Sequence, residues 1–181
     1  MNHSDFNPIK IELKILYRNF GQEYWSDYEN INQKFRKSIG ADSGDLKKAK
    51  EQLETGILFN ILAYCKGEPI GLVRLDMRSQ PPVIGDLYVE EKFRHKEAVL
   101  ENTPWLKNGT DYEVKHYLVK AAFVVARRAL FKEVKSYPHN VAGERVADWR
   151  RKQQAKWESE IMEIYEPREI LDSIKEQKST N

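Results

Sequence analysis

Cysteine is nearly absent from the sequence, and so are long apolar runs. Cys65 is the only cysteine in 181 residues, so no disulfide can form within one chain. The N-terminus has no basic segment followed by an apolar run, and no apolar stretch reaches the roughly eighteen residues that a membrane span needs. We therefore expect a cytoplasmic protein in a reducing compartment, without a secretion signal or a membrane partner.

The sequence also has few residues in patterns that bind metals or form serine nucleophiles. The four histidines, His3, His95, His116 and His139, show no pairing at the spacing of metal ligands, and one cysteine cannot supply a thiolate cluster. No Gly-x-Ser-x-Gly segment occurs. We therefore expect no metal site and no serine hydrolase of the kind built on that turn.

Charge of one sign is not in excess over the whole chain. The 30 basic residues stand against 28 acidic ones, and a net charge of +2 names no partner. The stretch from Arg127 to Lys156 is locally basic, with nine basic residues against three acidic ones. It is either a solvated helical surface or a site for an anion such as a nucleotide phosphate or RNA. Nucleic-acid binding ranks last, because no RRM, KH or helix-turn-helix signature accompanies the charges.

Hydrophobic periodicity predicts the elements of the first half. Residues 9–15 alternate apolar and polar side chains, which is typical of a strand with one buried face. Large apolar residues from Phe20 to Phe35 recur at helical spacing, and the helix should end before Gly40. Asp42 or Ser43 is expected to cap a second helix that Gly56 ends. Three β-rich runs follow as an antiparallel meander, at residues 57–65, 69–77 and 82–89.

The second half begins with the clearest helix. Residues 113–131 contain no glycine or proline and carry apolar residues at helical spacing. A short strand at 132–137, a helix at 141–157 and a last strand at 161–165 should follow, and the segment after Pro167 is amphipathic enough for a terminal helix. The order predicts an α+β domain with a mixed, mostly antiparallel central sheet and helices on both faces.

Four strings carry a resemblance to a known family. Residues 67–76 resemble the second hairpin of the GNAT N-acyltransferases, residues 84–89 with Phe93 and Arg94 resemble its fourth strand and exit, and residues 118–122 resemble its third helix. Residues 139–147 are similar to the Asn-x-x-Ser-x-x-Val segment of the ribosomal-protein branch, with Gly143 in place of serine. The chain is therefore identified as a divergent GNAT-like domain over residues 1–181, with its core at about 9–166 and a C-terminal helix or tail at 167–181.

The resemblance implies acetyl-CoA or another acyl-CoA as co-substrate. In that fold two strands diverge and leave backbone groups unpaired, to which the pantetheine amides bond like an added strand. Leu87 and Val89 would supply these backbone groups here. Asn140 would approach the pantetheine arm, although capping of the helix that follows is an equally good role for it. The first helices would wall the acceptor pocket, where Trp25 or Tyr28 could face the substrate.

Asp86 is the first candidate for the catalytic base and Tyr88 the second. Both alternate with Leu87 and Val89, so a regular strand would point them to the opposite face, and a bulge could re-aim them. Asp86 could instead bond only to a neighbouring loop. The tyrosine that many relatives carry in the last helix is missing, since Ala147 or Trp149 occupies the matching region, and Tyr165 is left as a third candidate.

The phosphate-binding glycines of the family are missing. Where relatives have Gln/Arg-x-x-Gly-x-Gly/Ala at a helix N-terminus, this chain has residues 94–99 in one register, or Glu113 and Lys115 at the glycine positions in another. Residues 97–111 look like an inserted loop. A remodelled anion site would use the side chains of Lys92, Arg94, His95 and Lys96, or a substitute loop at Gly109 and Thr110. The alternative is that the site is lost.

Two functions follow from these observations. The first is an N-acyltransferase that moves an acetyl or other acyl group from acyl-CoA to an amine on a small molecule or a protein. The second is a catalytically inactive GNAT-fold module that binds a protein, which the missing glycines favour. The C-terminal segment would pack on the domain or meet a second subunit in a homodimer.

Overall fold

A six-stranded sheet forms the centre of the structure. The computed structural model describes residues 7–42, 44–128, 135–136 and 141–161. The strand order is β5-β1-β2-β3-β4-β6, in which β1–β5 and β4–β6 are parallel pairs and the other pairs are antiparallel. The mixed, mostly antiparallel sheet of the predicted α+β class is confirmed. The strands are β1 (Ile9–Leu16), β2 (Leu58–Cys65), β3 (Glu68–Asp76), β4 (Val83–Val89), β5 (Ala98–Leu100) and β6 (Lys135–Ser136).

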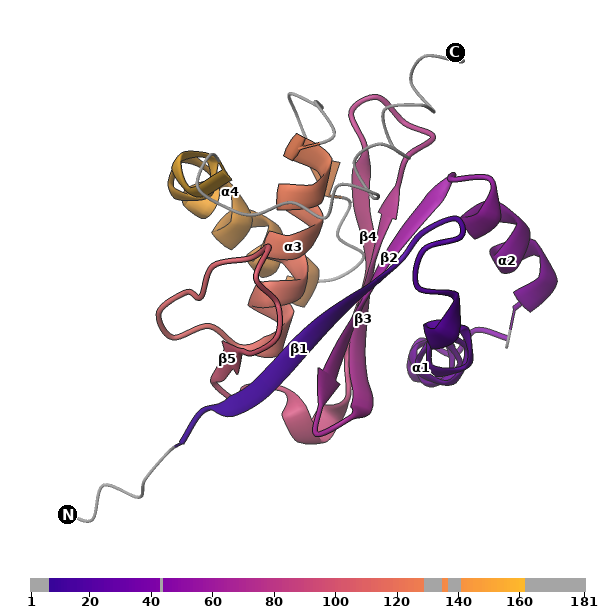
Figure 1. Cartoon of the computed structure of the whole chain (residues 1–181), viewed down its shortest axis with the longest axis horizontal. Helices are drawn as coiled ribbons and strands as arrows, with labels where there is room; N and C mark the ends of the chain where they lie inside the picture. The colour runs from indigo at the N-terminus through magenta and orange to yellow at the C-terminus, as the bar shows by residue number, and fades with distance from the viewer. Residues whose placement is uncertain (1–6, 43, 129–134, 137–140, 162–181) are drawn as a thin grey trace.

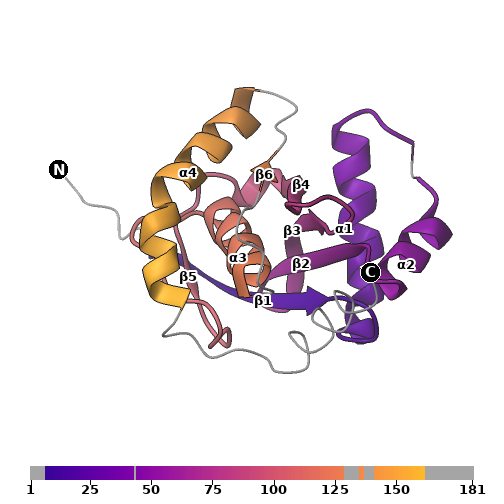
Figure 2. The ribbon, with the colours of Figure 1, turned by 90° about the horizontal axis from the view of Figure 1, so that it is seen from above.

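Helices cover both faces of the sheet, as predicted. Helices α1 and α2 lie on one face, and α3 and α4 lie on the other (Figures 1 and 2). The helices are α1 (Trp25–Ser38), α2 (Leu46–Glu54), α3 (Val114–Arg128) and α4 (Val141–Ile161), and two short 3-10 helices occupy Gln22–Tyr24 and Glu91–Phe93. None of the helices in the described residues is long and apolar enough to cross a membrane.

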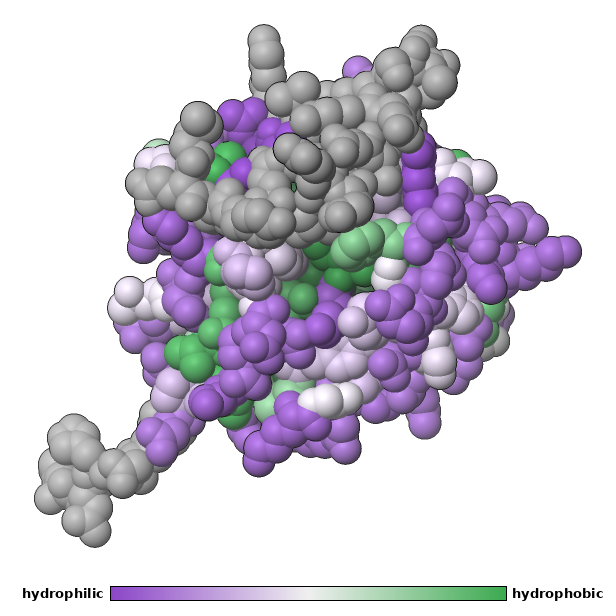
Figure 3. All heavy atoms as spheres, viewed as in Figure 1, coloured by the Kyte–Doolittle hydropathy of each residue, from purple (hydrophilic) through white to green (hydrophobic). Residues whose placement is uncertain are grey.

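The sheet separates two apolar cores. Alternate residues of β1, among them Ile11, Leu13 and Ile15, are buried toward α3 in the larger core. The smaller core lies under α1, where Tyr28 and Ile31 pack on β2 and β3. Hydrophilic residues cover most of the surface seen in Figure 3, and apolar residues show between them only in patches. The alternation in residues 9–15 and the helical spacing of the apolar residues therefore predicted correctly which side chains of β1 and α1 are buried.

Two expectations about the first helices were wrong in detail. Phe20 lies before α1, because Gly21 takes a left-handed conformation with φ of 75° and a 3-10 turn intervenes. A Cβ at Gly21 would lie 2.0 Å from the Ile15 carbonyl oxygen, so only glycine fits there. The cap of α2 is Asp45 rather than Asp42 or Ser43, since the Asp45 side chain accepts a hydrogen bond from the Lys48 amide.

The segment at 97–111, expected to be an inserted loop, contains the edge strand β5. After β4 the chain crosses below the sheet to its far edge, where Ala98–Leu100 pair in parallel with Ile9–Ile11. The pairing continues through a side chain, because the Leu13 amide donates to the Thr103 hydroxyl at 3.1 Å. Three residues are too few to show a periodicity, so this long-range pairing left no pattern in the sequence.

The C-terminal part was predicted less well. Helix α4 continues to Ile161, so the strand expected at residues 161–165 is wrong at its first residue. Residues 162–165, Tyr165 among them, and the terminal helix expected after Pro167 lie outside the described residues. Of the strand expected at residues 132–137, Lys135 and Ser136 are described and form β6.

Thr103→Val should lower the free energy of unfolding by about 1 to 3 kcal/mol, because it leaves the buried Leu13 amide without an acceptor while side-chain volume is kept. The measurement is chemical denaturation followed by circular dichroism. Thr110→Val, at an exposed position nearby, is the matched control and should change stability little. Equal effects of the two variants would contradict the role of Thr103 in fixing the edge of the sheet.

Candidate functional site

The centre of the candidate site is a bulge in β4. Tyr88 pairs with Leu72 and Gly85 pairs with Arg74, so Asp86 and Leu87 together face the single residue Val73. Asp86 takes a positive φ of 31°, which L residues adopt only under constraint. The extra residue turns Tyr88 toward the small core under α1, while Leu87 and Val89 pack against the large core under α3.

The free edge of β4 opens just beyond this point. Among the described residues, β6 pairs with β4 only at Val83 and Ile84. The Glu90 amide donates to the Ile70 carbonyl in β3. Because backbone groups alternate along a strand, those of Leu87 and Val89 point away from β3, toward the open edge. The Val89 carbonyl confirms this direction, since it accepts a hydrogen bond from Arg94 Nε at 2.9 Å.

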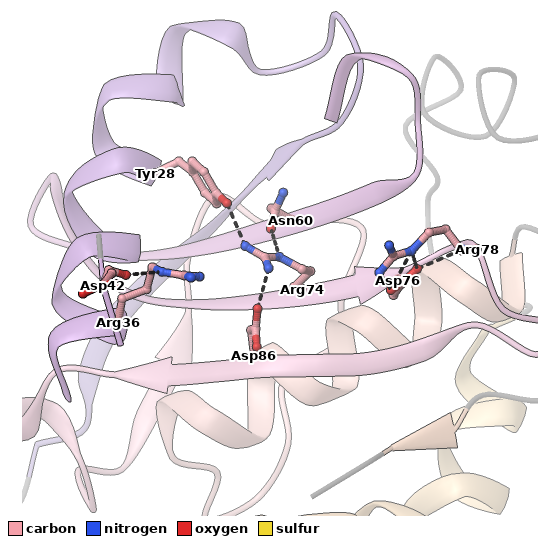
Figure 4. A network of polar contacts seen from close by, with 8 residues as sticks. All are labelled: Tyr28, Arg36, Asp42, Asn60, Arg74, Asp76, Arg78 and Asp86. Carbon is pink, nitrogen blue, oxygen red and sulfur yellow. Dashed lines mark hydrogen bonds and ion pairs between the residues drawn. The ribbon is translucent and has the colours of Figure 1, made fainter. Parts of the chain in front are cut away.

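The Asp86 carboxylate is held by an arginine that the sequence analysis missed. Arg74 Nη1 lies 2.5 Å from Asp86 Oδ2, and Arg74 Nη2 donates to the Tyr28 hydroxyl at 2.8 Å. Arg74 Nε also donates to Asn60 Oδ1 at 3.5 Å, so one guanidinium joins β2, β3, β4 and α1 (Figure 4). The sequence did carry a signal that Arg74 has a special role, because it is a charged residue within the apolar run of β3.

Tyr88 lies on the same face as Asp86, in a more apolar setting. Its ring packs 6.0 Å from that of Phe35, and the Arg94 guanidinium carbon lies 5.9 Å from the Tyr88 ring centroid. Burial raises the pKa of Tyr88, and the nearby Glu90 acts in the same direction. The phenol is therefore protonated at neutral pH, so it can donate a proton but is a poor base. It also lines a shallow pocket of about 440 Å³ beside Lys34 and Glu90.

The N-terminus of α3, where the resemblance places phosphates, is occupied by the chain itself. The Glu113 amide donates to His116 Nδ1 at 3.0 Å, and the His116 amide donates to the Glu113 carbonyl at 3.0 Å. Glu97 forms a β-bridge with Glu113, so two acidic residues meet at this point. This reciprocal cap satisfies amides that would otherwise be available to an anion. Helix α3 begins at Val114, so the alignment that puts Glu113 and Lys115 at the glycine positions of the family is the one that falls at the start of this helix.

Burial and charge fix the ionisation of this cap. Burial lowers the pKa of His116 to about 4, so its ring is neutral and can accept the Glu113 N–H. The Trp149 ring of α4 lies over it at 4.2 Å. Burial alone would raise the pKa of Glu113, but Lys115 Nζ at 2.8 Å holds it below its usual value. Glu113 is therefore a carboxylate at neutral pH.

The predicted phosphate-binding side chains gather in the turn after β4. Arg94 bonds to the Val89 carbonyl, and the Lys96 ammonium lies 5.7 Å from the Phe93 ring centroid. His95 is exposed, with Nδ1 3.7 Å from Glu113 Oε2. These groups lie in a turn of mixed charge between the edge of β4 and the start of α3, in which Glu90, Glu91 and Glu97 accompany them. Lys92 lies in the same turn, 3.9 Å from Glu90.

The substitute loop at Gly109 and Thr110 has less to offer an anion. The Gly109 amide donates to the Tyr117 hydroxyl at 3.1 Å, and a Cβ at Gly109 would lie within 2.5 Å of the Tyr112 ring. Gly109 therefore serves close packing against an aromatic ring. Asn140, the predicted contact of the pantetheine arm, lies outside the described residues.

The locally basic stretch from Arg127 to Lys156 is not one continuous basic surface. Arg150 is buried, and its Nε donates to the Ser136 hydroxyl at 3.1 Å. Arg127 Nε lies 3.3 Å from Glu158, and Arg151 pairs with Asp148. Several of the charges counted in the sequence are thus used within the fold, which weakens the case for a nucleic-acid surface.

His116→Gln should flatten the acid dependence of stability. A histidine whose pKa falls from about 6.5 to about 4 on folding binds more protons when unfolded, so the stability is complete above about pH 6.5 and is lost as the pH falls toward 4. After allowing for solvent access to the ring, we expect about 1 kcal/mol of loss between pH 6.5 and 4.5. Glutamine keeps the acceptor without titrating. Denaturant melts across this range should give a smaller loss for the variant, whereas parallel pH profiles would contradict the neutral cap.

By sequence the chain matches no protein-family model and no curated protein. By structure it is similar to the ribosomal-protein-alanine N-acetyltransferase of Brucella melitensis biovar Abortus 2308, with a TM-score of 0.55 and 11% identity over 77% of this chain and 89% of that one. It is also similar to AAC(6′)-Iy bound to a bisubstrate analogue, with a TM-score of 0.56 and 16% identity over 77% of this chain and 88% of that one. A third similar structure is a predicted acetyltransferase from Clostridium acetobutylicum with acetyl-CoA, with a TM-score of 0.53 and 10% identity over 77% of this chain and 87% of that one. The chain therefore has the fold of the GNAT acetyltransferases.

Proposed function

We propose that the chain is an N-acyltransferase that moves an acetyl or other acyl group from acyl-CoA to an amine. The observation that carries this proposal is the edge of β4 after Ile84, where no described residue of β6 pairs with it and the bulge at Asp86 follows at once. Structural neighbours of this fold include proteins with CoA and acetyl-CoA bound. The edge is where an extended acyl-pantetheine would add as a strand.

The backbone of Leu87 and Val89 would bind the pantetheine amides. Both residues direct their N–H and C=O groups away from β3, and their side chains pack on the large core. Arg94 now donates to the Val89 carbonyl, so it would have to move aside as the pantetheine takes that bond. Its guanidinium would then be available to the cofactor phosphates. Asn140 is proposed to meet the same arm.

The reaction requires one new bond and one broken bond. The amine nitrogen attacks the acyl carbon, the C–N bond forms, and the C–S bond breaks as the thiolate of CoA leaves and is then protonated. A strand amide polarises the acyl oxygen. Asp86 would take the proton that the amine loses, with Arg74 fixing one carboxylate oxygen and leaving the other for the substrate. Tyr88, protonated by its raised pKa, is suited to supply a proton to the leaving thiolate.

The phosphates would be bound by side chains instead of a glycine loop. The turn carrying Lys92, Arg94, His95 and Lys96 lies between the open edge and the start of α3. Point charges can replace backbone amides as ligands of a diphosphate, at a higher sensitivity to salt. Glu113 opposes them, because its carboxylate is at the helix terminus. We therefore expect weaker binding than a glycine loop would give.

A second candidate function is a non-catalytic module with this fold that binds a protein. The reciprocal cap of Glu113 and His116 favours it, because the amides of these two residues are already bonded and a carboxylate lies at the helix start. The two candidates differ in whether the chain binds acyl-CoA at all.

We also propose that residues 1–181 form one domain, that the protein is cytoplasmic and that a homodimer forms through the C-terminal segment. The acceptor would be an amine on a small molecule or a protein. Binding of a bisubstrate analogue of acetylneamine by AAC(6′)-Iy supports a small-molecule acceptor for this fold.

Isothermal titration with acetyl-CoA at moderate salt should show micromolar binding, about −8 kcal/mol. Arg94→Ala with Lys96→Ala should weaken the affinity many-fold, since two phosphate-facing charges are lost, and Glu113→Gln should strengthen it, since a repelling carboxylate is removed. Lys47→Ala, at an exposed position on α2, is the matched control and should leave binding unchanged.

No heat at millimolar ligand, together with no thermal shift, would overturn the acyltransferase proposal and favour the binding module. Binding that the Arg94 and Lys96 variants leave unchanged would show that the phosphates lie elsewhere. Where acetyl-CoA binds, release of free thiol in the presence of amines tests the transfer itself.

A further inference from the structure

A small polar pocket lies between α1 and α2, on the face of the sheet that carries Asp86. Its volume is about 160 Å³, which is about five water molecules at liquid density. It is lined by residues of α1, of α2 with the two residues before it, and by one arginine of β3, namely Asn32, Arg36, Gly44, Asp45, Leu46, Lys48, Ala49, Gln52 and Arg74. A ligand of fewer than about ten heavy atoms would fill it.

Asn32 is the first sign that this pocket is built for a ligand. The residue is 3% exposed, yet its Oδ1 has no hydrogen-bond donor among the described residues. A buried amide oxygen without a partner costs about 1 to 3 kcal/mol, and a leucine, which branches at the same carbon, would avoid that cost. An N–H or O–H of a bound molecule would satisfy it. The residue is therefore explained by a donor that the described part of the chain does not supply.

The charges of the pocket specify the rest of the ligand. Arg36 and Lys48 form no ion pair with a carboxylate of the described residues, and Arg36 is held in place by donating to the Asp42 carbonyl at 2.7 Å (Figure 4). The Asp45 carboxylate is turned to the Lys48 amide as the cap of α2. Two cations at a helix N-terminus, neither paired with a carboxylate of the described residues, favour an anionic ligand group and disfavour a polycation.

Arg74 connects this pocket to the proposed reaction centre. Its side chain lines the pocket, and its Nη1 bonds to Asp86 in the β4 bulge. Arg74 thus lies at the border between the pocket and the Asp86 carboxylate, which is bonded to its Nη1. Asn32 lines the same pocket from α1.

We propose that this pocket binds the carboxylate end of the amine acceptor, so that the acceptor class is an amino acid or short peptide with a free carboxylate. This inference rests on the proposed acyl transfer. The carboxylate meets Arg36 and Lys48, a neighbouring N–H donates to Asn32 Oδ1, and the amine at the far end reaches Asp86. A polycationic amine is excluded by the same charges.

Glycylglycine is the probe for this pocket, since it has a carboxylate, an adjacent amide N–H and a terminal amine. A ¹H–¹⁵N NMR titration of the full chain, with and without saturating CoA, should shift the Arg36 Nε and Gln52 signals and saturate. Glycylglycinamide, which lacks the carboxylate, and spermidine, a polycation, should bind at least about tenfold more weakly. Equal affinity for glycylglycine and its amide would overturn the proposal, as would shifts that spare this pocket.

Asn32→Leu should reduce glycylglycine affinity at least about tenfold and also raise the melting temperature, because the unpartnered amide is removed. Asn30→Leu, an exposed position on the same helix, is the matched control. Arg36→Met should abolish binding, while Arg36→Lys, which keeps the charge, should retain part of it. Unchanged affinity in Asn32→Leu would overturn the role of Asn32.

The outcomes separate this inference from the proposed function. Dipeptide binding without acetyl-CoA binding would overturn the proposed acyl transfer and leave the pocket as a ligand site. Acetyl-CoA binding without dipeptide binding, whether or not CoA is bound, would overturn the proposal for the pocket and leave the proposed acyl transfer unaffected.

Discussion

At Asp86 the strand β4 gains one residue over its partner, and the Arg74 guanidinium holds the carboxylate that this insertion turns toward α1. Three other features depend on that constraint. It reverses which side chains of β4 face each core, it precedes a stretch of β4 that the described residues of β6 do not pair, and it joins the sheet to α1 through Tyr28. A positive φ at an aspartate is strained, and the ion pair with Arg74, whose guanidinium also bonds to Tyr28 and Asn60, can maintain it.

The two ends of the candidate site, the edge of β4 and the start of α3, differ in how their backbone groups are bonded. At the edge of β4, the backbone groups of Leu87 and Val89 point away from β3, as an added strand needs, and the Val89 carbonyl accepts a hydrogen bond from Arg94 Nε. At the start of α3, Glu113 and His116 satisfy the amides internally and place a carboxylate where the resemblance expects phosphate. Residues 97–111 explain this, because they lead the chain to the far edge of the sheet as β5 before it returns to α3. Under the proposed function, affinity for the cofactor phosphates would depend on exposed cations, whose effect salt weakens.

Much of the fold could be predicted from the sequence because local patterns encode it. The alternation in β1, the Lys66-Gly67 turn and the unbroken helix α3 are local signals, and all three elements formed as predicted. The strand β5 could not be predicted, since its pairing with β1 is long-range and only three residues long. For the candidate site, Asp86 and Tyr88 were proposed by resemblance, whereas Arg74, Glu113 and His116 take part through contacts that spacing does not reveal. The bulge was anticipated only as a way to re-aim Asp86.

The central claim is that the edge of β4 beyond Ile84 accepts an extended pantetheine. Amide hydrogen exchange followed by NMR tests it most directly, with S-acetylpantetheine, which has no diphosphate, alongside acetyl-CoA. The account predicts that both slow exchange at the Leu87 and Val89 amides, while the Tyr88 amide, directed at β3, changes little. Unchanged exchange at Leu87 and Val89 with acetyl-CoA bound would contradict the claim, because the cofactor would then lie elsewhere on the molecule.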